Sequence, residues 1–162
     1  MEVTVNEVFV SELNQHLPIA RRIARIYFPD TDDRQDVLQE MMFQLWRSFP
    51  GFDGRSKFST WMYRVCLNTA LTYVRKGKTR GELLTQAHDQ IAEEVPTERN
   101  ERMEQLIAAI GLLSPVNKAI IMLYLEEMSY EEIASITGLT KSNVSVKIMR
   151  IKKELETRLK NS

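Results

Sequence analysis

Apolar residues recur along this chain at intervals of three and four, the spacing that puts them on one face of an α-helix. The alternation of apolar and polar residues that marks a half-buried strand is nearly absent. The clearest apolar stripe lies near the C-terminus and consists of Val144, Ile148, Ile151, Leu155 and Leu159. The sequence therefore predicts an all-α protein.

Prolines, glycines and capping residues divide the first half of this helical pattern into three segments. We expect helices over about residues 5–27, 32–49 and 57–76. Pro18 is expected to kink or divide the first helix, because proline removes one hydrogen bond of the helical ladder. The adjacent carboxylates of Asp32–Asp33 are expected to cap the second helix.

The following stretch, residues 77–97, contains two glycines, one proline and scattered polar residues without a sustained period. Such a composition indicates a connector. The predicted fold is therefore two small helical domains, residues 1–80 and 99–162, joined by an acidic, flexible linker over residues 81–98.

The C-terminal domain carries the signature of a helix-turn-helix. Ser129 and Glu132 form a capping box at the start of a short helix, and Gly138 ends that helix. Thr140 then caps a longer helix that runs to about Lys160. This arrangement places the second helix in the major groove of DNA. The simpler alternative is an amphipathic helix whose basic face is only solvated.

Opposite its apolar stripe, the final helix presents a face that mixes basic, small polar and apolar side chains. Basic side chains can reach guanine edges or phosphates, and an exposed apolar side chain can contact a thymine methyl group. The predicted groove-facing residues are Lys141, Ser142, Asn143, Ser145, Val146, Lys147, Met149 and Arg150.

The net charge of the chain is zero, with 22 basic and 22 acidic residues, and taken alone this argues against a nucleic-acid partner. The distribution argues the other way. Between Gly54 and Gly81 there are seven basic residues and no acidic one. A phosphate backbone responds to a local patch of this kind and not to the charge of the whole chain.

The same segment combines cations with aromatic residues. Lys57, Arg64, Asn68 and Arg75 share one face of the predicted helix. The aromatic residues interleaved with such cations are Phe52, Phe58, Trp61, Tyr63 and Tyr73. Cations that follow a backbone and aromatic rings that stack on unpaired bases are the two parts of single-strand recognition. The alternative assigns Phe58 and Trp61 to the hydrophobic core.

The second predicted helix has a row of carboxylates and aromatic residues outside its apolar stripe. This row consists of Asp36, Gln39, Glu40, Phe43, Trp46 and Arg47. A mixed row of this kind is typical of a protein–protein surface. The alternative is that Phe43 and Trp46 pack against the first helix.

Several functional classes are not predicted. One cysteine and two histidines cannot form a disulfide framework or a zinc site of the usual spacing. His16 and His88 lie apart from any catalytic constellation, and Cys66 lies between apolar residues as a packed thiol, so no enzyme, cofactor or small-molecule ligand is expected. No apolar run approaches the roughly 20 residues of a membrane span. The N-terminus lacks basic residues, which does not fit a signal peptide, so a cytoplasmic protein is expected.

Three segments together resemble the extracytoplasmic-function (ECF) group of bacterial RNA polymerase sigma factors. DRQDVLQEMMFQLWRSF resembles that family's core-polymerase-binding helix. FSTWMYRVCLNTALTYVRK resembles its promoter-melting, minus-ten-reading helix. LSPVNKAIIMLYLEEMSYEEIASITGLTKSNVSVKIMRIKKEL resembles its minus-thirty-five-reading domain. The three motifs occur in the family's order.

The resemblance implies roles for individual residues. The row on the second helix would bind the polymerase clamp. The family's minus-ten loop and helix map onto Phe52 with the loop to Lys57, and onto Val65 and Asn68, with Leu71 and Thr72 nearby. The cations and aromatic rings of the same segment complete the predicted minus-ten and melting residues, namely Phe58, Trp61, Tyr63, Arg64 and Arg75. The final helix would read the minus-thirty-five element. It departs from the commonest family pattern at Ser145 and Val146. This departure bears on which minus-thirty-five sequence the helix recognises, and it leaves the expected binding in the groove unchanged.

The partners implied by the resemblance are core RNA polymerase, promoter DNA and an anti-sigma factor, which in this family is often membrane-bound. The rival interpretation is a conventional helix-turn-helix regulator, with residues 1–80 as a dimerisation or ligand domain. The apolar pocket or phosphorylation site that a sensor domain would present is not evident in those residues.

Overall fold

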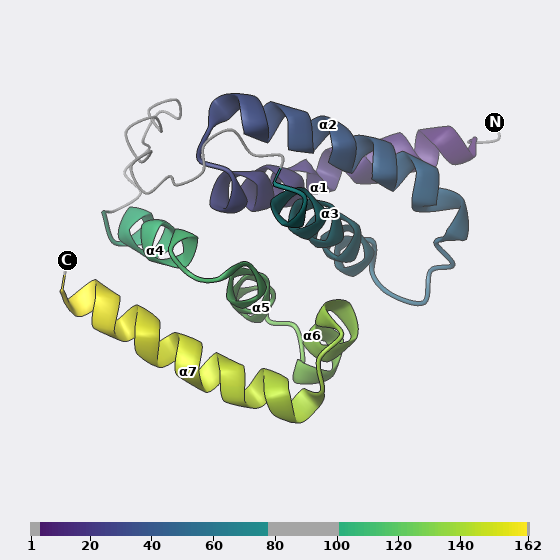
Figure 1. Cartoon of the computed structure of the whole chain (residues 1–162). Helices are drawn as coiled ribbons and strands as arrows, with labels where there is room; N and C mark the ends of the chain where they lie inside the picture. Colours follow the sequence, from purple (N-terminus) through teal and green to yellow (C-terminus); the bar gives the residue numbers. More distant parts are fainter. Residues whose placement is uncertain (1–3, 78–100, 162) are drawn as a thin grey trace. The chain divides into compact units, whose positions relative to one another are not determined.

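The computed structural model describes residues 4–77 and 101–161. Within those residues the chain forms seven α-helices and one short 3₁₀ helix, with no strand (Figure 1). The elements are α1 (Val5–Tyr27), α2 (Thr31–Ser48), η1 (Phe49–Gly51), α3 (Phe58–Arg75), α4 (Glu101–Gly111), α5 (Pro115–Leu125), α6 (Tyr130–Thr137) and α7 (Lys141–Lys160). The prediction of an all-α protein is confirmed.

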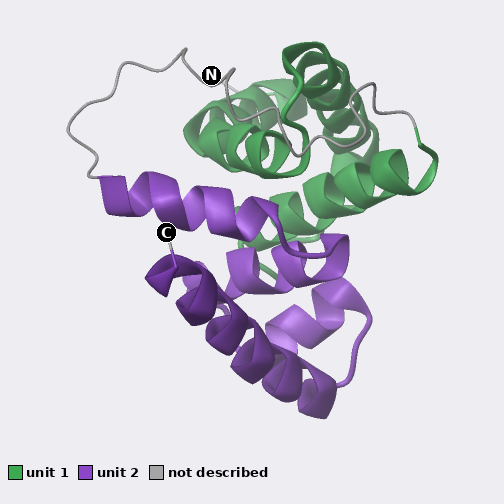
Figure 2. Ribbon diagram, turned by 60° about the vertical axis from the view of Figure 1, so that its left-hand side comes forward, with its two compact units in different colours: residues 1–84 green, residues 85–162 purple. Residues whose placement is uncertain are grey.

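The chain divides into two compact units, residues 1–84 and residues 85–162 (Figure 2). The first unit contains α1, α2 and α3, and the second contains α4 to α7. The predicted linker, residues 81–98, lies outside the described residues.

The first helix of the N-terminal unit begins with a capping box. The Glu7 N–H donates to Thr4 Oγ1 at 3.2 Å, and the Thr4 N–H donates to Glu7 Oε2 at 2.8 Å. The helix runs without a break through Pro18, so of the two expected effects the division is wrong, while the kink stays a prediction. Pro18 is exposed, and water can therefore hydrate the carbonyl group that the missing N–H leaves unpaired.

The cap of α2 differs from the prediction. Asp30, and not Asp32 or Asp33, is the N-cap residue, and its Oδ1 accepts from the N–H groups of Asp32 at 2.7 Å and Asp33 at 3.2 Å. Asp32 and Asp33 occupy the first turn, where a negative charge is favoured by the helix dipole. The helix therefore begins one residue earlier than expected, at Thr31.

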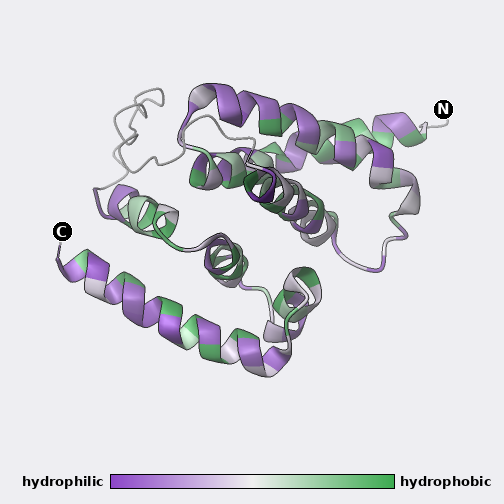
Figure 3. Cartoon of the chain, viewed as in Figure 1, coloured by the Kyte–Doolittle hydropathy of each residue, from purple (hydrophilic) through white to green (hydrophobic). Residues whose placement is uncertain are grey.

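The three helices of the N-terminal unit pack against one another around a single apolar core. Ile23 of α1, Met41 and Leu45 of α2, and Met62 of α3 are fully buried there. Figure 3 shows the corresponding division of each helix into an apolar side and a hydrophilic side. This packing fixes which faces of α2 and α3 remain exposed.

The core of the C-terminal unit is formed mainly by α5, α6 and α7. Of the predicted stripe on the last helix, Val144, Ile148, Ile151 and Leu155 are buried, while Leu159 is half-buried near the end of α7. They pack against apolar residues of the preceding helices, and the fully buried members of that group are Ile120, Leu123 and Ile133. The opposite face of α7 is thereby left exposed.

Candidate nucleic-acid and polymerase interfaces

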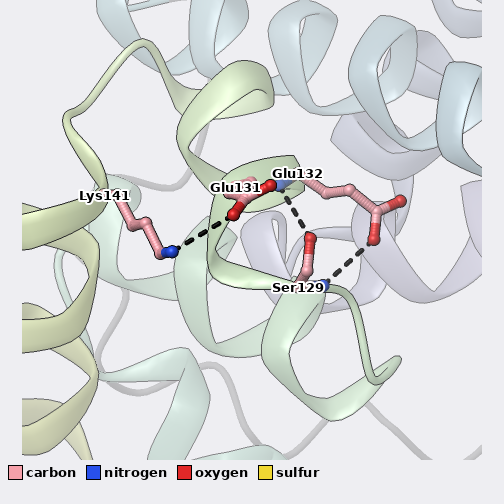
Figure 4. Close-up of polar contacts among 4 residues, drawn as sticks. All are labelled: Ser129, Glu131, Glu132 and Lys141. Carbon is pink, nitrogen blue, oxygen red and sulfur yellow. Dashed lines mark hydrogen bonds and ion pairs between the residues drawn. The ribbon is translucent and has the colours of Figure 1, made fainter.

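The turn between α6 and α7 is set by local hydrogen bonds. Figure 4 shows the capping box of α6, in which the Glu132 N–H donates to Ser129 Oγ at 3.1 Å and the Ser129 N–H donates to Glu132 Oε1 at 3.0 Å. Gly138 ends α6 with φ at +79°, a left-handed conformation that glycine adopts without steric cost. Thr140 then caps α7 by accepting from the Asn143 N–H at 3.1 Å.

One ion pair bridges the turn on its outer side. Lys141 Nζ, at the start of α7, lies 3.1 Å from Glu131 Oε1 of α6 (Figure 4). Both side chains are well exposed, so the pair adds little stability. In this structure the Lys141 ammonium group lies against Glu131 of α6, whereas we predicted that it contacts DNA.

The exposed face of α7 contains the residues predicted to contact the major groove. Val146 is 39% exposed and Met149 is 65% exposed, which is unusual for apolar side chains on a helix that has a buried stripe. The other exposed members are Lys141, Ser142, Asn143 and Arg150, and the half-buried ones are Ser145 and Lys147. Sequence periodicity therefore predicted correctly which side of α7 is exposed.

Beside this face, a depression of about 530 Å³ lies between α6 and α7. It is lined by Tyr130 of α6 and by Ser145, Met149 and Lys153 of α7, among others. Its polar lining groups are two hydroxyls, the ammonium groups of Lys152 and Lys153, and the Glu156 carboxylate. The Lys152 ammonium group, also on this side, lies 4.4 Å from the centre of the Tyr124 ring and so makes a cation–π contact.

The four residues predicted to share one face of this segment are all exposed: Lys57, which is the N-cap of α3, and Arg64, Asn68 and Arg75 within α3. No acidic residue occurs in this helix. In its C-terminal half, Thr72 Oγ1 donates to the Asn68 carbonyl at 2.8 Å and Arg75 Nη2 donates to Thr72 Oγ1 at 3.5 Å. Three members of the cationic face, Arg64, Asn68 and Arg75, are thus carried on one continuous helix.

A second depression, of about 360 Å³, lies between α2 and α3. From α3 it is lined by Val65, Asn68 and Thr72, three of the predicted minus-ten residues. From α2 it is lined by Glu40 and Gln44, whose side chains were not expected beside these residues. Leu71 is half-buried outside the lining, and Phe52 lies in a separate aromatic cluster described next.

Four rings from η1, the following loop and α3 form an aromatic cluster. Phe52 lies 5.2 Å from Trp61, and Phe58 lies 5.3 Å from Trp61, between ring centroids. The fourth ring is Phe49, at 6.0 Å from both Phe52 and Trp61. Sequence analysis did not single out Phe49. It lies four residues after the buried Leu45, and this helical spacing could have predicted that its ring faces the same side.

Burial corrects the predicted DNA contacts of two aromatic residues. Tyr63 is 1% exposed and Phe58 is 8% exposed, so neither ring is accessible to a base in this conformation. Both belong to the core because they fall on the side of α3 that packs against the other helices. Phe52 and Trp61 are half-buried and keep accessible surface.

The aromatic residues of the predicted polymerase-binding row are exposed. Trp46 is 61% exposed and Phe43 is 51% exposed, so the alternative in which they pack against the first helix is wrong. Asp36, Gln39 and Arg47 are also exposed, while Glu40 is half-buried. The structure therefore presents two large rings on a polar helix face.

Residues 4–77 and 101–161 offer little for other kinds of site. No group of three or more histidine, cysteine, aspartate or glutamate side chains there could hold a metal ion. No helix in that part of the chain is long and apolar enough to cross a membrane. Cys66 is buried, and burial raises the pKa of its thiol to about 12, which leaves the thiol protonated and unreactive at neutral pH.

The C-terminal unit contains a helix-turn-helix whose second helix exposes basic, polar and apolar side chains. The N-terminal unit is a three-helix bundle with a cationic face and an aromatic cluster. Together these features define the class of helical, DNA-binding transcription proteins. Comparison with known families makes this definite. Residues 13–80 match the model described as Sigma-70 region 2, and residues 103–155 match the model described as Sigma-70, region 4. The rival interpretation, a conventional helix-turn-helix regulator, is overturned because the first match covers the segment that it assigned to a sensor domain.

Curated relatives agree with these two matches. The chain is 30% identical over 142 residues to the ECF RNA polymerase sigma-E factor of Haemophilus influenzae, covering 79% of this chain and 75% of that protein. It is 29% identical over 150 residues to the ECF RNA polymerase sigma factor SigE of Mycolicibacterium smegmatis, covering 88% of this chain but 58% of that protein. The chain therefore belongs to the ECF family of RNA polymerase sigma factors. Members of this class bind core RNA polymerase and give it promoter specificity.

Solved structures show the same fold. The sigma factor RpoE of Bartonella quintana, crystallised in complex with the anti-sigma factor NepR, matches with a TM-score of 0.77 at 22% identity and covers 95% of this chain and 98% of that chain. CnrH, in complex with the cytosolic domain of CnrY, matches with a TM-score of 0.67 at 22% identity, covering 97% and 90% of the two chains. At this identity the likeness concerns the fold alone.

Proposed function

We propose that this sigma factor uses three surfaces, one for polymerase and two for promoter DNA. Residues 1–80 would bind polymerase and open the minus-ten region, and residues 99–162 would read the minus-thirty-five element. The observation that carries the proposal is the α3 face, on which Lys57, Arg64 and Asn68 are exposed on a helix without any acidic residue.

The polymerase surface would be the exposed row of α2. Phe43 and Trp46 are the large apolar groups on that row, and partly exposed aromatic rings are favoured anchors at protein interfaces. The flanking carboxylates and the Arg47 guanidinium group would form the polar rim. Burying both rings against the polymerase would remove from water the apolar surface that the free protein exposes.

The minus-ten surface would combine the α3 face with the half-buried rings of Phe52 and Trp61. Lys57, Arg64 and Arg75 would follow the phosphate backbone of a separated strand. Asn68 lines the depression between α2 and α3, where its amide could donate to and accept from the edge of an extruded base. Val65, Leu71 and Thr72 would complete the contact, while Phe58 and Tyr63 would support it from the core.

The minus-thirty-five surface would be the exposed face of α7. In a helix-turn-helix the N-terminal residues of the second helix contact base edges. Ser142, Ser145, Val146 and Met149 lie in that half of the helix. Asn143, Lys147 and Arg150 flank them, and Lys141 stands at the entry to the helix.

Three further proposals follow from membership of the family. The protein would have no catalytic activity of its own, because the polymerase makes the RNA. It would act in the cytoplasm, where the polymerase and the chromosome are. Like the Bartonella quintana RpoE that was crystallised with NepR, it would be restrained by an anti-sigma factor, which could be membrane-bound.

Run-off transcription with purified core polymerase tests the assignment. The intact chain should initiate from a cognate promoter. Trp46→Ala should weaken polymerase binding, whereas Gln15→Ala, at an exposed position of α1, should leave it unchanged. Arg150→Glu should abolish dependence on the minus-thirty-five element while polymerase binding is retained.

The matched control for Arg150→Glu is Arg158→Glu, the same charge reversal two turns further along α7. The assignment of α7 is wrong if Arg150→Glu leaves promoter output unchanged, or if both reversals have equal effects.

A further inference from the structure

We propose that Val146 and Met149 read two neighbouring thymines of the minus-thirty-five element through their 5-methyl groups. This inference rests on the proposed groove-facing role of α7, and it names the base chemistry that this role selects. It is specific to this chain, because it depends on which side chains α7 exposes.

The first step is the exposure of these two side chains. Met149 is 65% exposed and Val146 is 39% exposed, while every other large apolar residue of α7 is buried or half-buried. The neighbouring exposed positions, Ser142 and Arg150, are polar. Two apolar groups on an otherwise polar surface gain free energy only when an apolar partner covers them.

The second step identifies that partner. Lys147, Arg150 and Lys153 lie within one helical turn of Val146 or Met149 along α7. Lys152, Lys153 and Glu156 line the depression beside Met149, so cations outnumber the one carboxylate there, and a net positive charge favours a polyanion. In the major groove of duplex DNA the thymine 5-methyl is the apolar group among the hydrogen-bonding groups that the base edges present. Charge and apolar surface together therefore point to thymine.

The third step is spacing. Val146 and Met149 are three residues apart on one helix, so their Cβ atoms are roughly 5–6 Å apart. Successive base pairs are about 3.4 Å apart along the DNA axis. The two side chains therefore span neighbouring base pairs, one methyl group each, on the same strand or on opposite strands.

The surroundings of Met149 leave this contact room to form. Met149 lines the depression between α6 and α7, so no neighbouring side chain fills the space beside it. Its unbranched thioether chain can adjust to the position of a methyl group. Ser145, which lines the same depression as Met149, is small enough to let the helix approach the base edges closely.

The experiment uses the full chain bound to core polymerase. A promoter library with a randomised minus-thirty-five region is first selected by transcription, and the preferred element is sequenced. Each thymine of that element is then replaced by uracil, which removes only the methyl group. At two neighbouring positions we expect polymerase–promoter affinity to fall about fourfold per methyl, as expected for one apolar carbon withdrawn from contact.

Protein variants link the effect to the two residues. In Met149→Ala, the uracil effect at one of these positions should disappear, and in Val146→Ala it should disappear at the other. The matched control is Leu112→Ala, which truncates a side chain that is 57% exposed in the same unit but outside the groove face. In that variant both uracil effects should remain.

The outcomes separate this inference from the proposed function. If no minus-thirty-five preference is selected, or if Arg150→Glu does not remove it, the groove-facing role itself fails. If a preference is selected but uracil replaces thymine at no cost, or if the cost persists unchanged in both alanine variants, the methyl readout is wrong. In that case a protein partner that covers Met149 becomes the better explanation of its exposure.

Discussion

Neighbouring aromatic residues of α3 have different roles because they differ in burial. Tyr63 is 1% exposed and holds α3 against the other helices, whereas Trp61, two residues earlier, keeps accessible surface at the edge of the aromatic cluster. Periodicity indicated that this segment is helical, but it could not decide which rings are accessible. That depends on where α1 and α2 lie, which is information from distant parts of the chain.

Asn68 is the residue whose role can be tested most directly. It is exposed, it lines the depression between α2 and α3, and its amide is expected to hold an unstacked base. Asn68→Ala should slow promoter opening roughly fivefold, the effect of about one hydrogen bond, without weakening polymerase binding. Opening is measured by the permanganate reactivity of thymines in the minus-ten region. Equal losses of opening and of polymerase binding would refute the role given to Asn68.

Cys66 provides a prediction about pH. Burial raises the pKa of its thiol from 9.0 to about 12, so between these values the unfolded chain releases a proton that the folded chain keeps. Folding stability should therefore fall as pH rises from about 9 toward 12. Denaturant unfolding of the intact chain should show a steeper fall than that of Cys66→Ala, in which this titration is absent. Parallel pH profiles for the two proteins would show that the thiol does not contribute.

At the scale of elements, several helix boundaries follow from local signals. The capping boxes at Thr4 and Ser129, Pro115 at the start of α5 and Gly138 at the end of α6 fix four of them. The start of α2 was harder to predict because Asp30, Asp32 and Asp33 are all suitable caps. Only the backbone conformation, extended at Asp30, decides among the three aspartates.

The α6 capping box should contribute measurably to the stability of the helix-turn-helix. Ser129→Ala removes the side-chain oxygen that accepts from the Glu132 N–H at 3.1 Å and should cost about 1 kcal/mol in the free energy of unfolding. Glu131→Ala removes the exposed ion pair with Lys141 and one carboxylate from the first turn of α6, and should cost less than Ser129→Ala. Chemical denaturation of both variants measures the difference. A larger loss in Glu131→Ala would mean that the bridge to α7, and not the cap, stabilises the turn.

At the scale of the whole molecule, charge and size limit what the free protein can do. Its net charge is zero, and each unit exposes only a small cationic face. Sequence analysis identified both faces because each lies on one side of a single helix, where helical spacing alone brings the residues together. It could not bring Glu40 and Gln44 of α2 beside Asn68, since that depends on how two helices pack.

These limits predict that promoter binding depends on polymerase. Two small cationic faces make few phosphate contacts, and they can act on one promoter together only when their separation matches the distance between the two promoter elements. Core polymerase would hold both faces at that distance, so adding it should raise promoter affinity on the order of a hundredfold or more. Fluorescence anisotropy of labelled promoter DNA, with and without core enzyme at equal salt, measures the gain. The affinity of the free chain should be weak and should fall further with salt, because it depends on counterion release. The prediction is wrong if the free chain binds promoter DNA as tightly as its complex with polymerase does. The chain alone would then hold its two cationic faces at the distance between the two promoter elements.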